Sequence, residues 1–256
     1  MNPHKALLLS TLFVSAVTVF VVHDAAAQNA VRTSDARSRS ASDYYNRGNE
    51  RQKQGDLRGA IEDYTFAITF NPNLAQAFNN RCVAHYLTGD LDSALTDCTK
   101  AIELKADYAE AWQNRGNIRQ DKGDFDAAIA DYDQAVQLNP RYFAAYHGRG
   151  NAWHQKKVYD KAISDYDQAI KINPKSASIY YNRGAAHRES GNLERAIADY
   201  DQAIKLNPLY APSWAQRGLL HKLRGNFDKA QRDFDECLRL DPNLKSIVET
   251  TAIGMK

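Results

Sequence analysis

Two series of charged residues recur through the chain at one spacing, and both could take part in chemistry. Six arginines lie 34 residues apart, and six aspartates follow at the same interval. They are Arg47, Arg81, Arg115, Arg149, Arg183 and Arg217, with Asp63, Asp97, Asp131, Asp165, Asp199 and Asp233. Because guanidinium and carboxylate groups form two-point ion pairs, the equal numbers favour a structural series of Arg–Asp pairs. An arginine stripe that binds phosphate or carboxylate ligands is the functional alternative.

Other aspartates and the histidines are weaker candidates for a functional site, in this case a metal site. Three Asp-Tyr-Asp motifs, which begin at Asp131, Asp165 and Asp199, imitate a pair of metal-binding carboxylates. On a helix, residues two apart point in nearly opposite directions and cannot bind one ion. We expect the first acid of each motif to be ion-paired and the second to be solvated. His187 and His221 could approach each other, but the sequence offers no third ligand, so we predict no metal site.

The sequence carries no catalytic signature. It lacks a phosphate-binding loop and the motifs His-Glu-x-x-His, Gly-x-Ser-x-Gly and Cys-x-x-Cys. Its 33 basic residues nearly balance its 31 acidic residues, and a net charge of +2 gives no reason to expect nucleic acid or an anionic membrane as the main partner. We predict a protein that is not an enzyme, uses no cofactor and binds no nucleic acid.

The elements that must position these residues follow a repeat. Prolines, aromatic residues and small residues recur every 34 residues, and Ala106 is the one departure among the prolines. The three sets are Pro72, Pro140, Pro174, Pro208 and Pro242; Tyr44, Phe78, Trp112, Tyr146, Tyr180 and Trp214; and Gly48, Cys82, Gly116, Gly150, Gly184 and Gly218. The sequence therefore predicts six units, at 41–74, 75–108, 109–142, 143–176, 177–210 and 211–244.

Each unit is predicted to form two helices, A and B, joined by a tight turn; we number its places from 1 to 34. In the first unit, apolar residues from Leu57 to Ile68 recur at spacings of three and four, which is typical of one helix face. A first helix precedes them and ends at Gly55, and Asp56 can cap the second. The fourth unit has Lys157 where the others have this glycine, so we expect a strained turn there.

This pattern resembles the tetratricopeptide repeat family, whose period is 34 residues and whose repeats carry aromatic, Gly, Ala and Pro residues at such places. The resemblance covers about four fifths of the chain. It implies an all-α solenoid of six helix-turn-helix repeats in a right-handed superhelix. It also implies a protein that binds another protein or a peptide.

In that family, A helices line the concave surface, and places two, five, six and nine face inward. Carboxamides dominate two of these places here: Asn46, Asn80, Asn114, Asn182 and Gln216 at place six, interrupted by Gly148, and Asn49, Asn117 and Asn151 at place nine. The series resembles the asparagine ladder of the O-linked N-acetylglucosamine transferase superhelix, which grips an extended peptide by its backbone. A carboxamide suits this task because it offers both a donor and an acceptor. Asparagines that are merely solvated or cap helices are the alternative.

Aromatic residues on the same face would add contacts with the peptide. Tyr45 and Tyr181 are placed to stack or to make apolar contacts, which favours aromatic or proline-containing segments. The cations with which chaperone-binding members of the family clamp a C-terminal carboxylate are missing, because Tyr45, Asn79 and Glu110 stand at comparable inward places. We therefore expect no carboxylate clamp.

Cysteines take two core places of the second unit. Cys82 replaces the small residue of helix A and Cys98 replaces the aromatic residue of helix B, so buried thiols are the first expectation. A disulfide between Cys82 and Cys98 is the alternative for an exported protein, since the two residues face each other across the helices.

The N-terminal residues 1–27 are typical of a cleavable signal peptide, with a basic start, an apolar stretch and Ala25-Ala26-Ala27 before the predicted cleavage. The apolar stretch falls short of the ~20 residues of a spanning helix, so we expect no membrane span after cleavage. The mature protein is expected to be periplasmic or secreted. Residues 28–40 are predicted to be a flexible polar lead-in, and residues 245–256 a short cap or tail.

Together these features predict a scaffold that binds a protein or extended peptide in the concave groove of the superhelix. A structural subunit or a chaperone-like assembly factor of the bacterial cell envelope is the alternative. Self-association through the solenoid ends would suit the structural role, because the short tail at 245–256 covers the last repeat only in part.

Overall fold

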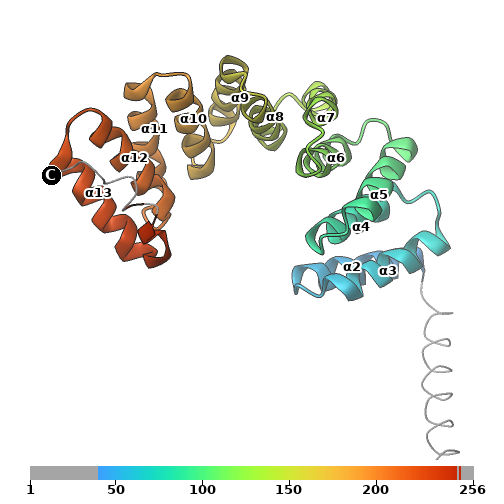
Figure 1. The fold of residues 1–256 in the computed structure, drawn as a ribbon. Helices are drawn as coiled ribbons and strands as arrows, with labels where there is room; N and C mark the ends of the chain where they lie inside the picture. Colours follow the sequence, from blue (N-terminus) through green and yellow to red (C-terminus); the bar gives the residue numbers. More distant parts are fainter. Residues whose placement is uncertain (1–39, 247, 249–256) are drawn as a thin grey trace, which may run out of the picture. The chain divides into compact units, whose positions relative to one another are not determined.

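The computed structural model describes residues 40–246 and residue 248, in two compact units that divide between Ala77 and Phe78. The predicted signal peptide, nearly all of the lead-in and most of the predicted C-terminal tail lie outside the described residues. Figure 1 shows the described chain as a series of helices joined by short loops. Each unit is considered by itself.

The described residues form twelve α-helices and one 3-10 helix, and no strand occurs among them. The A helices are α2 (Ala41–Lys53), α4 (Ala75–Leu87), α6 (Ala109–Asp121), α8 (Phe143–Gln155), α10 (Ala177–Glu189) and α12 (Ala211–Leu223). The B helices are α3 (Leu57–Phe70), α5 (Leu91–Leu104), α7 (Phe125–Leu138), α9 (Tyr159–Ile172), α11 (Leu193–Leu206) and α13 (Phe227–Leu240), followed by η1 (Pro242–Leu244). The predicted all-α fold of helix-turn-helix repeats is confirmed.

The turn from helix A to helix B uses one left-handed residue in every repeat. Five repeats place glycine there, with φ between 74° and 84°, and the fourth places Lys157 there, with φ of 60°. The expected strain at Lys157 is confirmed, because a side chain is disfavoured in this conformation. After the turn, Asp56, Asp90, Asp124 and Asn192 accept hydrogen bonds from backbone N–H groups in the first turn of the B helix.

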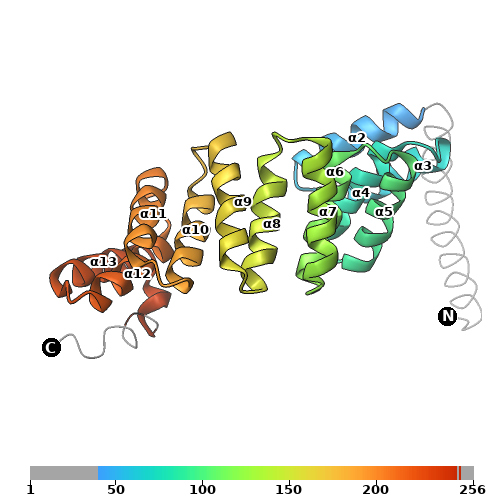
Figure 2. The ribbon, with the colours of Figure 1, turned by 90° about the horizontal axis from the view of Figure 1, so that it is seen from above.

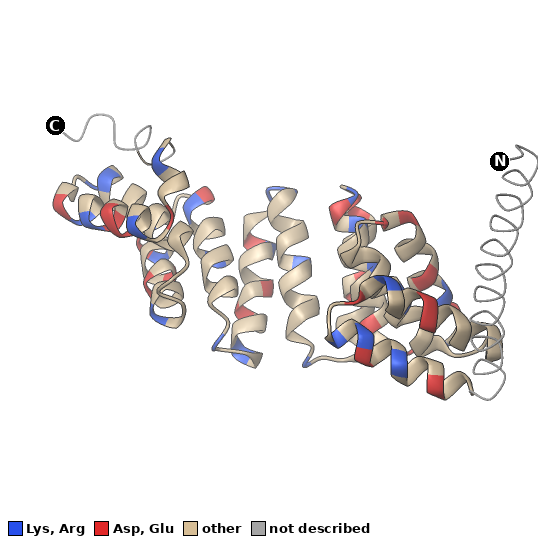
Figure 3. Ribbon diagram, turned by 90° about the horizontal axis from the view of Figure 1, so that it is seen from below, with Lys and Arg blue, Asp and Glu red and all other residues tan. Residues whose placement is uncertain are grey.

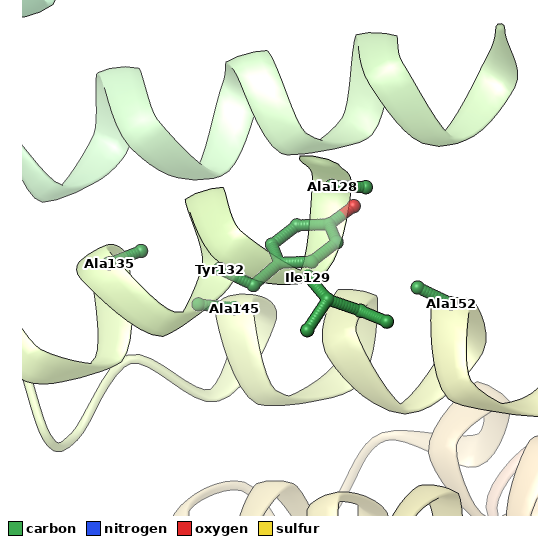
Figure 4. Packing of buried hydrophobic residues seen from close by; sticks show 6 residues of the cluster. All are labelled: Ala128, Ile129, Tyr132, Ala135, Ala145 and Ala152. Atoms are coloured by element: carbon green, nitrogen blue, oxygen red, sulfur yellow. The ribbon is translucent and has the colours of Figure 1, made fainter. Parts of the chain in front are cut away.

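In every repeat but the second, the core contains an aromatic ring of helix B packed against a glycine of helix A. Tyr132 of α7 is fully buried, and a Cβ added to Gly116 would lie 2.8 Å from its ring. A Cβ added to Gly148, in the next A helix, would lie 2.6 Å from the same ring. Figure 4 shows the Tyr132 ring among Ala128, Ala135, Ala145 and Ala152. Because one ring thus touches two repeats, repeats cannot bury their apolar surface singly.

In the second unit, helices α6 to α13 follow one another in chain order (Figure 2). Three A helices contact one another in turn, α6 with α8 and α8 with α10, whereas no two consecutive B helices of the described chain lie as close together. Helices α6, α8 and α10 therefore lie on the inner side of this part of the stack. We call the surface formed by places 2, 5, 6 and 9 of the A helices the A face. None of the described helices has the length and apolar content needed to cross a membrane.

Candidate functional site

The arginine at place 7 of every repeat binds the aspartate at place 23 of the same repeat through two points. Its Nε donates to one carboxylate oxygen at 2.7–3.0 Å, and its Nη2 donates to the other. The six aspartates are at most 5 % exposed. Such a two-point pair satisfies a buried carboxylate that would otherwise be costly to desolvate.

The same guanidinium groups are held on two further sides. Each lies over the aromatic ring three places earlier on its own helix, at 4.8 Å for Arg115 over Trp112 and 5.6 Å for Arg183 over Tyr180. In the later repeats, Nη1 also reaches the second acid of the preceding Asp-Tyr-Asp motif. These pairs are Arg149 with Asp133, Arg183 with Asp167 and Arg217 with Asp201, at 2.5–2.6 Å. The second acids are about half exposed, as expected for solvated residues, and they form ion pairs as well.

A second cation, which the sequence reasoning missed, approaches the buried aspartates from place 11. Arg119 Nη1 lies 2.9 Å from Asp131, and Arg51 Nη1 lies 3.2 Å from Asp63. Histidines take this place in repeats 2, 5 and 6, whereas Trp153 takes it in repeat 4. Burial raises the pKa of Asp165, the acid of repeat 4, although Arg149 opposes the shift. The arginines are therefore engaged on several sides, which argues against an open arginine stripe for phosphate or carboxylate ligands.

Place six of the A face joins consecutive repeats in the second unit. The Asn114 side-chain N–H donates to Asn79 Oδ1 at 3.0 Å, and Asn182 donates to His147 Nε2 at 2.8 Å. In both pairs the donor is at place six and the acceptor is at place five of the preceding repeat. Burial lowers the pKa of His147 to about 4, so its ring is neutral and accepts this hydrogen bond at neutral pH. These asparagines are thus fixed by their neighbours.

Place nine has an internal role as well. The hydroxyl groups of Tyr64, Tyr132 and Tyr166, at place 24, donate to Oδ1 of the place-nine asparagine of their own repeat at 2.7–2.9 Å. The acceptors are Asn49, Asn117 and Asn151. Repeat 5 has Ala185 at place nine, and the buried Tyr200 hydroxyl there has no hydrogen-bond partner among the described residues. The place-nine asparagines therefore support the core tyrosines as well as the A face.

The predicted peptide-binding residues differ in how much of them is open to a ligand. Asn46 is exposed, and the others are half-buried: Tyr45, Asn49, Asn80, Asn114, Asn117, Asn151, Tyr181, Asn182 and Gln216. Within the described part of the chain, Oδ1 of Asn114 and of Asn182 accepts no hydrogen bond. Gln216 accepts a hydrogen bond from Arg188. The A face of the second unit therefore offers open carbonyl oxygens at Asn114 and Asn182, whereas the side-chain oxygens of Asn117, Asn151 and Gln216 already accept hydrogen bonds.

The amide series is interrupted at repeat 4, and an aromatic group follows. Gly148 stands at place six because the Tyr132 ring occupies the space of a side chain. Tyr181, at place five of repeat 5, lies 5.3 Å from Tyr210 edge to face and 5.6 Å from Tyr200, measured between ring centroids. In the first unit, Tyr45 packs beside Tyr64 with centroids 6.1 Å apart. Both predicted aromatic contacts of the A face are thus held in place by neighbouring rings.

Cys82 and Cys98 form a disulfide that joins α4 to α5. Both residues are fully buried, at the places where other repeats pack glycine against an aromatic ring. Cys237 is a buried free thiol. The second repeat thus replaces a packing contact by a covalent bond.

Charges are interleaved over the described helices, and Figure 3 shows basic and acidic segments alternating along them. Helix α7 carries acidic charges alone and α12 basic charges alone, but the helices beside each of them carry charges of the opposite sign or of both signs. The A face therefore offers hydrogen-bonding and aromatic groups rather than a field of one sign.

The comparisons with known proteins agree with this architecture. The model described as "Tetratricopeptide repeat" matches residues 41–74, 177–210 and 211–244, and the model described as "TPR repeat" matches 116–157 and 150–189. These matches together cover more than half of the chain, which belongs to the tetratricopeptide repeat family. No curated protein matched the chain.

Several solved structures share the fold. MamA protein is 25% identical with a TM-score of 0.58, over 67% of this chain and 94% of that one. YrrB, described as a TPR protein with an unusual peptide-binding site, is 19% identical with a TM-score of 0.62, over 75% of this chain and 100% of that one. The pilF protein of Pseudomonas aeruginosa is 19% identical with a TM-score of 0.74, over 83% and 96% of the two chains. Proteins of this fold generally mediate protein–protein interactions.

Proposed function

We propose that the protein is an exported, non-catalytic scaffold that binds an extended peptide segment of a partner protein along the A face. The observation that carries the proposal is the state of Asn114 and Asn182. Their N–H groups are held by the preceding repeat, while their Oδ1 atoms accept no hydrogen bond within the described chain. A fixed, open acceptor can receive a backbone N–H without reading the side chain beside it.

The surroundings of these acceptors fit an extended peptide. Tyr181 presents a ring, already ordered by Tyr210, that can cover an apolar or proline side chain at little entropic cost. Neighbouring arginines are engaged with aspartates, so they do not demand an acidic ligand. In the first unit, Asn46 and Tyr45 occupy the same two places of α2. YrrB, which shares the fold, is likewise described as having a peptide-binding site.

A binding comparison tests the proposal. A peptide is selected from a displayed random library against residues 28–256, and its Kd is measured for the wild-type chain and for Asn114→Ala/Asn182→Ala. Two lost hydrogen bonds of about 1 kcal/mol each should weaken binding roughly 30-fold. The matched control is Gln134→Ala/Gln168→Ala, which removes two exposed carboxamides from B helices and should leave Kd unchanged.

The two variants together decide the location of the site. If both bind like the wild-type chain, or if only the Gln134/Gln168 variant is weakened, the A face is not the peptide-binding surface. Circular dichroism before the titrations excludes unfolding as the cause of lost binding, since Asn114 and Asn182 also join repeats.

The export component of the proposal is supported by the signal-like sequence of residues 1–27 and by the Cys82–Cys98 bond, because disulfides persist in oxidising compartments. The mature N-terminus is expected at Gln28. Intact-mass measurement of the protein from the envelope fraction checks this, and a chain that retains Met1 would contradict it.

A further inference from the structure

The last repeat carries basic residues at three places where no other repeat has more than two, the nearest being repeat 4 with Lys156 and Lys161. Arg224, Lys229 and Arg232 occupy places 14, 19 and 22, near the turn from α12 to α13. The same places in repeat 5 hold Ser190, Arg195 and Ala198. None of these three places belongs to the A face, so the group is separate from the proposed peptide-binding surface.

The three cations line a cavity of about 590 Å³ between α11, α12 and α13. Its remaining walls come from Ile197, Asp201, Arg217, His221, Asn226 and Asp233. An adjoining cavity of about 340 Å³ shares Asn226, Lys229 and Arg232 and also touches Asp228. The cations therefore surround an open space large enough for a small molecule.

The charges around this cavity are not balanced. Arg217 is neutralised by Asp233 and Asp201, each at 2.6 Å. Arg224 lies 3.3 Å from Glu194 in an exposed pair, which contributes little binding energy. Lys229 and Arg232 form no ion pair with any described residue. The cavity thus presents an excess of positive charge.

A buried ring nitrogen on the wall of the cavity also lacks a partner within the described chain. His221 Nδ1 is shielded from solvent and forms no hydrogen bond there. In repeat 2, the equivalent Nδ1 of His85 lies 3.4 Å from Asp90, the residue that caps the B helix. Repeat 6 has Asn226 at that place, and its side chain does not cap α13. The 14-residue helix α13 therefore begins without the side-chain acceptor that most B helices have, and Asp228 is the one acidic residue in its first turn.

We propose that this cavity binds a phosphate group of a small molecule. Phosphate is a dianion with several acceptor oxygens, and it matches two guanidinium groups, one ammonium group and the N-terminal end of a helix better than a single carboxylate does. His221 Nδ1 supplies a further polar contact for such an oxygen once the ring carries its proton there. Arg217 forms the floor of the site and remains ion-paired with Asp233 and Asp201 when phosphate binds.

Calorimetric titration of residues 28–256 with sodium orthophosphate and with sodium pyrophosphate, at ionic strength held constant with chloride, tests the site. We expect saturable binding with one site per chain. Arg224→Ser/Lys229→Ala/Arg232→Ala should weaken it at least tenfold. This variant should fold, because repeats 5 and 3 hold these residues at the same places: Ser190, Ala127 and Ala198.

A charge-matched control distinguishes phosphate binding at this cavity from a general electrostatic attraction of phosphate to the protein. Lys171→Ala/Lys175→Ala/Lys205→Ala removes the same charge from exposed places outside the cavity and should leave the phosphate affinity unchanged. Equal weakening of both variants, or wild-type affinity in the cavity variant, would overturn the proposal. Citrate at the same ionic strength is the third arm, and binding as tight as that of pyrophosphate would contradict the assignment to phosphate.

Discussion

Residues 75–142 and residues 143–210 are two successive pairs of repeats. They have the same arrangement of helices, but different side-chain contacts hold those helices together. Repeat 2 links its helices by Cys82–Cys98, where repeat 4 packs Gly150 against Tyr166. The first pair of repeats is joined by two carboxamides, Asn79 and Asn114, whereas the second pair uses His147 and Asn182. Equivalent places of the repeats can therefore be joined by different interactions, either a disulfide or a packing contact, and either an Asn–Asn or an Asn–His hydrogen bond.

Two further places distinguish these segments. Tyr132 donates to Asn117 in the first segment, whereas the equivalent Tyr200 has no partner in the described chain because Ala185 replaces the asparagine. The turn that uses Gly89 in the first segment uses Lys157 in the second. We infer that 75–142 is sensitive to reduction and insensitive to mild acid, and that 143–210 has the opposite behaviour.

The largest loss of stability is expected on replacing the buried aspartate at place 23, which is present in both segments. Asp131→Ala should lower the free energy of unfolding by about 3 kcal/mol or more, because it leaves Arg115 and Arg119 without their carboxylate in a buried place. Asp199→Ala should cost less, since Arg183 keeps Asp167 at 2.5 Å. Urea unfolding monitored by circular dichroism measures both. The control Asp133→Ala, at a half-exposed acid, should cost under ~1 kcal/mol. A larger loss for Asp199→Ala than for Asp131→Ala would refute this account of the ion pairs.

Reduction of the disulfide should give the next largest loss of stability, and this loss arises from the first segment. Opening a loop of 16 residues should destabilise the protein by about 3 kcal/mol. The variant Cys82→Gly/Cys98→Tyr restores the pair of residues that repeat 4 has and should unfold at the same urea concentration with and without dithiothreitol. A wild-type midpoint that dithiothreitol does not move would contradict the covalent joint.

Mild acid should act mainly on the second segment. Burial lowers the pKa of His147 to about 4, below the ordinary value of about 6.5. The unfolded chain therefore binds a proton that the folded chain does not, and stability is lost as pH falls from about 6.5 toward 4. Between pH 7 and pH 5 the loss from this group is about 2 kcal/mol. His147→Asn copies Asn79 and should remove that part of the pH dependence. Equal pH profiles of variant and wild type would count against a neutral, buried His147.

The smallest effect concerns the unpartnered tyrosine. Ala185→Asn should give the Tyr200 hydroxyl the acceptor that Tyr132 has and raise stability by about 1 kcal/mol. The reciprocal Asn117→Ala should lower it by a similar amount. Both are measured by urea unfolding. An unchanged or lower midpoint for Ala185→Asn would mean that Tyr200 is satisfied in another way.

The sequence predicted the fold because each rule acts locally and recurs in every repeat. The 34-residue grid located the helix pairs, and the glycine of the turn identified Lys157 as strained. The role of the place-nine asparagines could not be predicted from such local rules. Their bond to the core tyrosines depends on a contact between helices, although the sequence held a signal: each place-nine asparagine is followed by Tyr fifteen residues later.

The second cation of the ion pairs was missed for a related reason. Place 11 holds arginine, histidine or tryptophan, and this variety of residue types obscures the fact that five of its six residues are basic. The cysteines left two outcomes open because spacing alone does not set the oxidation state. The basic cavity of the last repeat escaped the sequence analysis since its residues come from three helices.

Photo-crosslinking tests the central claim, that the A face binds the partner, most directly. A benzophenone side chain is placed at residue 114 on α6 or, as a control, at residue 134 on α7, and both proteins are irradiated in the envelope fraction of their own cells. Both helices belong to repeat 3, and the control residue Gln134 is exposed. We predict a crosslinked partner from residue 114 and none from residue 134. A partner crosslinked only from residue 134 would contradict the account and assign binding to the B helices.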